Sequence, residues 1–431
     1  CPGKSRCLDA FIVALCQACE GGEKRWYTST LELQLASLEF CKACRSVPTL
    51  HVRVAHSTHN SLWSPPRSQT SSRVPVVRAL SLTWGLPMRV LVQSAAMELW
   101  GWSATLELLG ATLPAFSASL GPVVWPRGLK QLSFGSGFNQ SIVEFVWPAF
   151  LQQLSFGPDF DQPIAGVEWP ASLLQLSLGD GFEQPITGVV WPASLQQLSL
   201  GRSFNQPVEG VVWPASLHRL SFMGWFNQPI AEMAWPASMQ QLSFGCDFDQ
   251  PVLGVNWPAL LRTLSFGNRF NQPIAGVVWP TELLRMELGH DFNRSVVGVD
   301  WPASLQQLSF GHVFNQPIAS VVWPASLQGL SFGFRFNQPI TAVLWPASLR
   351  QLHFGCAFNH PIVGVVWPAS LQQLSFGADF AQPILGVVWP ESLQRLSFLG
   401  RFNQPIAGMM WPPYLQHLSF GRSFNQPIAA V

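Results

Sequence analysis

A Trp-Pro dipeptide recurs fourteen times in this chain, from Trp125 to Trp411, and each copy follows the previous one by 22 residues. A fixed period of this length is typical of solenoids, in which each repeat forms one coil and buries its apolar side chains against the next coil. The sequence therefore predicts a single stacked array. Positions within a repeat are counted below from the Trp, so that the Pro is +1.

The apolar positions of the repeat are nearly invariant. Leu or Met occupies +4 and +7, Phe or Leu occupies +9, Phe occupies +13 in every copy, and Ile or Val occupies +17. The segment Leu-Ser-Phe at +7 to +9 alternates apolar and polar residues, which favours a short strand with one buried face. Strands from successive coils would then stack in parallel about 4.8 Å apart.

Two further positions predict turns. Gly occupies +10 in twelve copies, and where Met223 and Leu399 replace it the Gly follows one residue later, so we expect a turn that requires Gly. Asn occupies +14 in ten copies, and repeated Asn in a solenoid forms a ladder that satisfies backbone groups. A row of ligand-binding amides is the less favoured interpretation.

The pattern Leu-x-x-Leu-x-Phe-Gly-x-x-Phe-Asn-Gln-Pro-Ile resembles the FNIP repeat, a 22-residue relative of the leucine-rich repeat, and the resemblance covers residues 123–431. It implies a mainly β, leucine-rich-repeat-like solenoid of about fourteen 22-residue coils with a stacked parallel sheet, curved and used for interactions. It supplies no catalytic residues. One departure is the Trp before the Pro, where the family would have an aliphatic residue.

The first 122 residues differ from the array. Residues 1–78 contain a long Arg-, Ser-, Pro- and His-rich stretch and are expected to be disordered or non-native. We expect the chain to be either a fragment or a translation that extends upstream of a true start near Met88 or Met97. Residues 79–122 are interpreted as degenerate capping repeats, and residues 123–431 as the solenoid, which we expect to continue beyond Val431. Two Cys-x-x-Cys pairs could bind zinc through four thiolates, although chance occurrence and a redox pair are alternatives. These cysteines are Cys16, Cys19, Cys41 and Cys44.

Two surfaces are candidates for binding a partner. The residues at +11 and +12 differ in almost every copy, which is typical of a binding edge or of drift at exposed loops. Their candidate members are Arg202, Trp225, Asp247, Arg269, Asp291, Phe334 and Arg335. The outward strand positions +6 and +8 are mostly Gln and Ser, which is also consistent with a solvated sheet face. The candidates there are Arg285, Glu287 and His353, and we expect Arg285 to pair with Glu287.

Other classes of function have less support. Residues 125–431 contain 13 Lys or Arg against 16 Asp or Glu, which disfavours nucleic acid as the partner. Catalysis needs two reactive groups within hydrogen-bonding reach, whereas Glu287 and His353 lie three coils, about 14 Å, apart, so no enzyme is expected.

No run of 18 apolar residues predicts a membrane span, and no secretion signal is recognisable, so an intracellular, cytoplasmic location is expected. The sequence favours a protein–protein interaction scaffold that binds an unidentified protein through the variable edge or the strand face, without a cofactor apart from the zinc. The alternative is a passive spacer attached to a functional domain.

Overall fold

The computed structural model describes Trp125 and residues 128–428, together with the backbone of four short strands that precede them. These strands are β1 (Leu31–Glu32), β2 (His51–Val54), β3 (Leu80–Thr83) and β4 (Leu109–Thr112). β2 pairs antiparallel with β1 and β3, whereas β3 and β4 pair in parallel. The rest of the expected segments 1–78 and 79–122, including the four cysteines proposed to bind zinc, lies outside the described residues.

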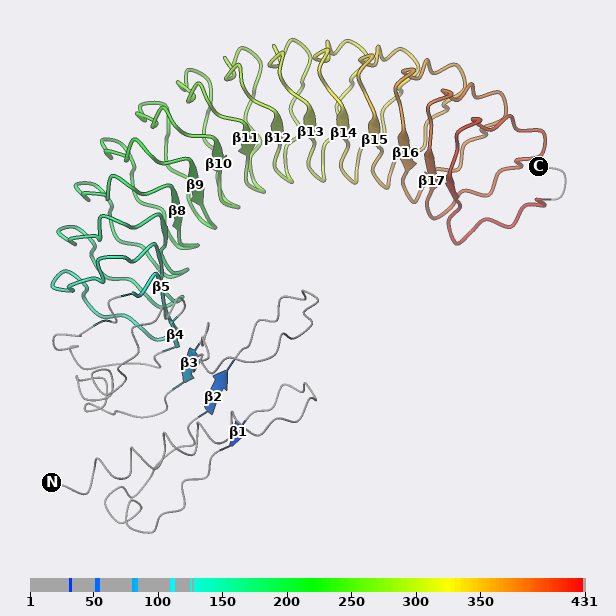
Figure 1. Cartoon of the computed structure of the whole chain (residues 1–431). Coiled ribbons are helices and arrows are strands. Elements are labelled where there is room, and N and C mark those ends of the chain that lie inside the picture. Colours follow the sequence, from blue (N-terminus) through cyan, green and yellow to red (C-terminus); the bar gives the residue numbers. More distant parts are fainter. Residues whose placement is uncertain are drawn as a thin grey trace, which may run out of the picture.

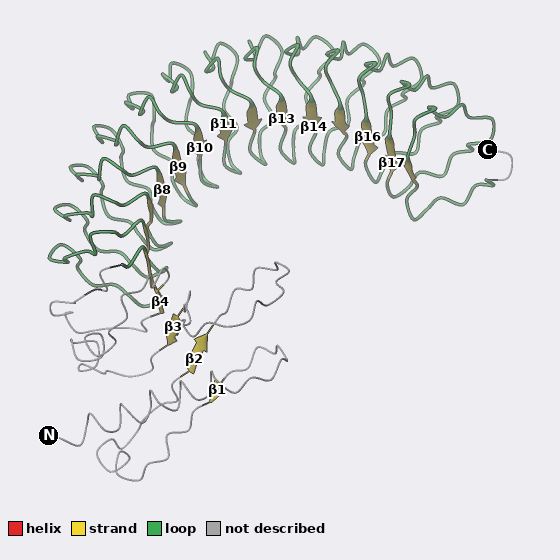
Figure 2. Ribbon diagram, in the orientation of Figure 1, coloured by secondary structure: helices red, strands yellow, loops and turns green. Residues whose placement is uncertain are grey.

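Fourteen strands follow, one in each 22-residue repeat, and each pairs in parallel with the next (Figures 1 and 2). The register advances by one repeat per strand, so that Gln175 pairs with Gln197. The solenoid with a stacked parallel sheet is confirmed. The strands are β5 (Gln131–Phe134), β6 (Gln153–Ser155), β7 (Gln175–Ser177), β8 (Gln197–Leu200), β9 (Arg219–Phe222), β10 (Gln241–Ser243), β11 (Thr263–Ser265), β12 (Arg285–Glu287), β13 (Gln307–Ser309), β14 (Gly329–Ser331), β15 (Gln351–His353), β16 (Gln373–Phe376), β17 (Arg395–Phe398) and β18 (His417–Ser419).

Three turns complete each coil. In the coil that begins at Trp191, the Leu195 N–H donates to the Pro192 carbonyl at 3.0 Å, and the Phe204 N–H donates to the Gly201 carbonyl at 3.2 Å. In the third turn, the Val211 N–H donates to the Val208 carbonyl at 3.3 Å. Pro at +1 can begin the first turn because its carbonyl accepts the bond, and the N–H that proline lacks is not needed there. Each coil is therefore one strand and three turns.

The core consists of columns of identical side chains. Leu at +4 and +7 and Phe at +13 are almost completely buried; Leu195, Leu198 and Phe204, for example, are at most 2% exposed. Neighbouring Phe rings at +13 are nearly parallel, with centroids 6.0–6.2 Å apart. Burial of each such side chain stabilises the fold by about 1.5–3 kcal/mol. Each coil thus depends on its neighbours for most of its apolar burial.

The Asn ladder at +14 is confirmed. The Oδ1 atom of Asn205 accepts the backbone N–H of Asn227 at 2.9 Å and the side-chain Nε2 of Gln228 at 3.0 Å. Asp249 performs the same role, since its Oδ1 accepts the Asn271 N–H at 2.9 Å. These amides join successive coils and are not arranged as a row of free ligand-binding groups.

A second ladder was not anticipated. Ser at +3 donates its hydroxyl to the carbonyl of the residue at +4 in the preceding coil, as Ser194 does to Leu173 at 2.7 Å. The same bond recurs in eight further coils, formed by Ser172, Ser216, Ser238, Ser304, Ser326, Ser348, Ser370 and Ser392. The recurrence of Ser at this position was visible in the sequence.

The reason for Gly at +10 differs from the expected one. Gly201 has no positive φ, but a Cβ at this residue would overlap the carbonyl oxygen of Gly179 in the preceding coil. The requirement comes from the close approach of two backbones, which only Gly permits. Where Leu399 occupies +10, Gly400 adopts a φ of +66° and meets the backbone of Ala378 in the same way.

The array is curved, with the strands along the inner side of an arc (Figure 1). Phe centroids at +9 are 5.3–5.8 Å apart between coils, whereas the Trp centroids are 6.0–6.5 Å apart. Strand hydrogen bonds hold the inner side at about 4.8 Å. Because the spacing increases from the sheet to the Trp column, the coils fan outward.

Candidate functional site

The turns at +11 and +12, here called the variable turns, form one edge of the solenoid, just after each strand. Their backbone is fixed, because the N–H at +12 donates to the carbonyl at +11 of the preceding coil. Trp225 donates to Arg202 at 2.7 Å and Arg335 donates to His312 at 2.8 Å in this way. Side chains that differ between coils therefore project from a rigid backbone ladder.

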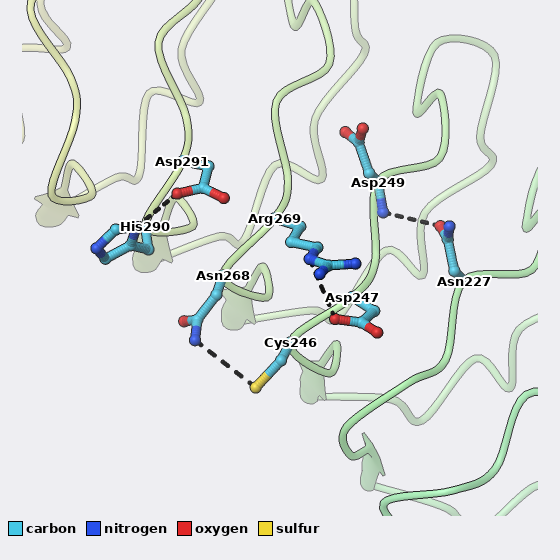
Figure 3. Close-up of polar contacts among 8 residues, drawn as sticks. All are labelled: Asn227, Cys246, Asp247, Asp249, Asn268, Arg269, His290 and Asp291. Carbon is cyan, nitrogen blue, oxygen red and sulfur yellow. Dashed lines mark hydrogen bonds and ion pairs between the residues drawn. The ribbon is translucent and has the colours of Figure 1, made fainter.

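Some of the variable side chains pair with each other across coils. The Arg269 Nε lies 3.4 Å from the Asp247 Oδ1 (Figure 3). The Arg401 Nη1 lies 3.4 Å from the Asp379 Oδ1 at the same positions of two later coils. Both arginines are largely exposed, so each pair contributes about 0–1 kcal/mol. Asp247 and Arg269 thus partly neutralise one another at this edge.

An aromatic stack lies on the same edge. The rings of His290 and His312 are parallel with centroids 4.6 Å apart, and His312 and Phe334 are also 4.6 Å apart. The His290 ring contacts the Asp291 carboxylate, so that the predicted site residue Asp291 serves to position this stack (Figure 3). The two histidines were missed in the sequence, although an aromatic or His residue at +11 in three consecutive coils was a readable signal.

The remaining predicted residues of the edge are exposed. Trp225 is 52% exposed and Phe334 is 47% exposed. Arg335 follows Phe334 and forms no ion pair with any residue of the described array. Arg202 lies beside Gly224, whose missing side chain leaves room for it. Exposed Trp, Phe and Arg side chains are the types that dominate protein interfaces.

The strand-face candidates are less organised. The expected ion pair between Arg285 and Glu287 is not formed, and this prediction is wrong: the Glu287 carboxylate accepts the Ser265 hydroxyl at 3.0 Å instead. Residues two apart on a strand share a face, but their side chains stand perpendicular to the sheet, so a cross-strand partner is nearer.

His353 lies on the same face, in β15, with its Nδ1 atom 2.7 Å from the Ser375 hydroxyl. Burial lowers the pKa of His353 below its ordinary value. The structure brings none of the three strand-face candidates into direct contact with another. Cys246 and Cys356, at +11, are free thiols.

The comparisons with known proteins agree with this geometry. The FNIP Repeat family matches residues 204–247, 292–335, 314–357, 336–377, 358–400 and 402–430. The matched repeats are FNIP repeats. A search of curated proteins returned no match to this chain.

Two solved structures resemble the FNIP array. CroV588, described as a novel circular leucine-rich-repeat protein, is 44% identical with a TM-score of 0.69. The match covers 74% of this chain and 47% of CroV588, so this chain spans about half the length of that protein. The Toll–Spätzle complex of Drosophila, in its glycosylated form, matches with a TM-score of 0.57 and 11% identity over 82% of this chain and 56% of that chain. This second likeness concerns the fold alone.

None of the residues that the structure describes belongs to a helix long and apolar enough to cross a membrane.

Proposed function

We propose that the FNIP array is a non-catalytic, cytoplasmic protein-interaction scaffold that binds an unidentified partner protein through its variable turns. The observation that carries this proposal is the combination of a hydrogen-bonded backbone ladder with exposed side chains that change from coil to coil. A rigid backbone reduces the entropy lost on binding, so the affinity depends on the side chains that it presents.

The strongest part of this edge is the segment from His290 to Arg335. Phe334 ends an aromatic stack that already fixes its ring, and Arg335 beside it has no partner within residues 128–428. A pre-ordered aromatic ring next to an unpaired guanidinium matches the residue types of interface hot spots. Trp225, five coils earlier, extends the same edge. The likeness to leucine-rich-repeat structures is consistent with a scaffold role.

The experiment compares two triple variants of the 431-residue chain as baits. One carries Trp225→Ser, Phe334→Ser and Arg335→Ser at the variable turns. The matched control carries Val212→Ser, Val322→Ser and Val366→Ser on the outer side, where these valines are 81–83% exposed. Substitutions at such exposed positions change stability by at most about 0.5 kcal/mol. Proteins retained from a lysate of the source organism are quantified by mass spectrometry, and circular dichroism checks the folding of both variants.

We expect that the native chain and the outer-side control bind the same protein with equal affinity. The variable-turn variant should bind that protein about tenfold to a hundredfold more weakly. Its affinity for each purified bait is then measured by calorimetry. Equal binding by all three baits would remove the variable turns as the site. Retention of no protein by any bait would support a passive spacer.

A further inference from the structure

Charge is segregated between the two sides of the array. The inner face is defined here as positions +5, +6 and +8, which are the residue that precedes each strand and the two outward side chains of the strand. This face carries six Lys or Arg residues and one acidic residue, Glu287, whereas the other positions of residues 128–428 carry six Arg and fifteen Asp or Glu. An array that is acidic as a whole therefore has a basic inner face.

Five arginines supply most of this charge, and all are exposed. None of them forms an ion pair with a described residue, in contrast to Arg269 and Arg401 at the variable turns. Other coils have mostly Gln at the same positions, so the fold does not require a guanidinium there. These five residues, here called the inner arginines, are Arg219, Arg262, Arg285, Arg350 and Arg395.

The inner arginines are spread along the arc. Arg219, Arg285 and Arg395 occupy one row of the sheet, because β9, β12 and β17 carry them at the same register position. At about 4.8 Å per strand, the row from β9 to β17 spans about 38 Å. An extended polypeptide rises about 3.3 Å per residue, so about twelve residues would reach from the first arginine to the last.

Most residues of the inner face are uncharged. From β5 to β11 the inner face is hollowed into a groove lined by Gln and Ser side chains, with Arg219 as its charged lining residue. Amides and hydroxyls both donate and accept hydrogen bonds, so they suit a polar backbone laid across them. A concave surface with an excess of positive charge also concentrates its electrostatic field.

We propose that the inner face binds an extended acidic polypeptide segment. Nucleic acid is the weaker match, because the face carries no Phe, Tyr or Trp on which bases could stack, and Lys130 is the one lysine of the described array. The surface is separate from the variable turns, so this inference does not depend on the proposed function. If the inner face does not bind an acidic segment, the proposed binding at the variable turns is unaffected.

The test measures binding of a fluorescent peptide with Glu and Ser alternating over about sixteen residues, long enough to span the inner arginines. The Arg219→Gln, Arg285→Gln and Arg395→Gln triple variant installs the residue that most other coils have at +6, so it is expected to fold. We expect it to bind about tenfold more weakly than the native chain, since each exposed ion pair contributes a factor of a few. Binding by the native chain should also weaken as salt is raised.

The matched control removes the same charge elsewhere through Arg294→Gln, Arg401→Gln and Arg422→Gln, and its affinity should equal that of the native chain. Three outcomes would overturn the proposal. They are no binding of the acidic peptide to the native chain, an equal loss in both triple variants, and equal binding of a neutral peptide with Gln in place of Glu. Tighter binding of an oligouridylate of the same length would assign the face to RNA instead.

Discussion

A missing acceptor at Ala381 interrupts the Asn ladder. Ala381 occupies +14, so it offers no side-chain oxygen to the backbone N–H of Asn403. The other bond of the ladder remains, because Gln404 donates to the Ala381 carbonyl at 2.7 Å as Gln228 does to the Asn205 carbonyl. We expect Ala381→Asn to stabilise the array by about 1 kcal/mol by completing the ladder. Hydrogen exchange at the Asn403 amide should slow and the denaturation midpoint should rise. Ala357→Asn, placed at a variable turn, is the control and should change neither.

His353 makes stability depend on pH. Burial holds its pKa in the folded state below the ordinary 6.5, so the unfolded chain binds the proton more readily. The contribution of His353 to the free energy of unfolding is therefore full above about pH 6.5. It falls as the pH decreases from 6.5 toward the folded pKa. His353→Ser, which restores the usual residue at +8, should lose less stability than the native chain between pH 7.5 and 5. Parallel pH profiles from denaturant titrations would contradict this assignment.

At the scale of residues, the sequence predicted what repetition reveals and missed what depends on side-chain direction. The Asn ladder was predictable because ten copies share the residue and its turn chemistry is general. The hydrogen-bond partner of Glu287 was not predictable, because Ser265 on the adjacent strand and Arg285 on the same strand are both its neighbours. Only the direction of the side chains selects Ser265. The inner arginines were visible as departures from Gln, but their common face emerged only with the fold.

At the scale of the coil, two recurring Gly residues have different structural roles. Gly188, in the third turn, has a φ of +77° and open space around its α-carbon, whereas Gly201 at +10 lies against the backbone of Gly179. We expect Gly188→Ala to cost about 1–2 kcal/mol through backbone strain. Gly201→Ala should cost about 3 kcal/mol, because no rotation of a side chain can relieve a contact with a backbone oxygen. Chemical denaturation of the two variants measures the difference.

If the two substitutions lower the free energy of unfolding equally, one of two explanations holds. Either the coils separate at Gly201 without penalty, or the turn at Gly188 tolerates no side chain. The distinction matters for sequence interpretation, because both positions appear simply as recurring Gly. The sequence predicted a turn at +10 and did not single out the Gly of the third turn. The close contact at +10 is a property of two coils and therefore cannot be read from one repeat.

At the scale of the whole molecule, the curvature depends on the difference in coil spacing between the inner and the outer side of the array. Hydrogen bonds set the strand spacing on the inner side, and the outer side holds a column of parallel indoles at 6.0–6.5 Å. The indole N–H groups of twelve of these tryptophans have no hydrogen-bond acceptor. The column therefore acts through its bulk, and the FNIP pattern with an aliphatic residue at this position should form a flatter array.

Replacement of Trp191, Trp213, Trp235, Trp257 and Trp279 by Leu tests this account. Each substitution removes apolar volume, and the indole N–H groups of Trp191, Trp235, Trp257 and Trp279 have no hydrogen-bond partner among the described residues. The outer side of the array should therefore contract toward the strand spacing, and the arc should straighten. The radius of gyration from small-angle X-ray scattering should increase, while the stability falls by about 1–3 kcal/mol per site, a loss that fourteen coupled coils share. Val190→Ser, Val212→Ser and Val278→Ser, which alter exposed side chains beside the same column, should leave the radius unchanged. An unchanged radius in the folded Leu variant would mean that the three turns of each coil, and not the indoles, set the curvature.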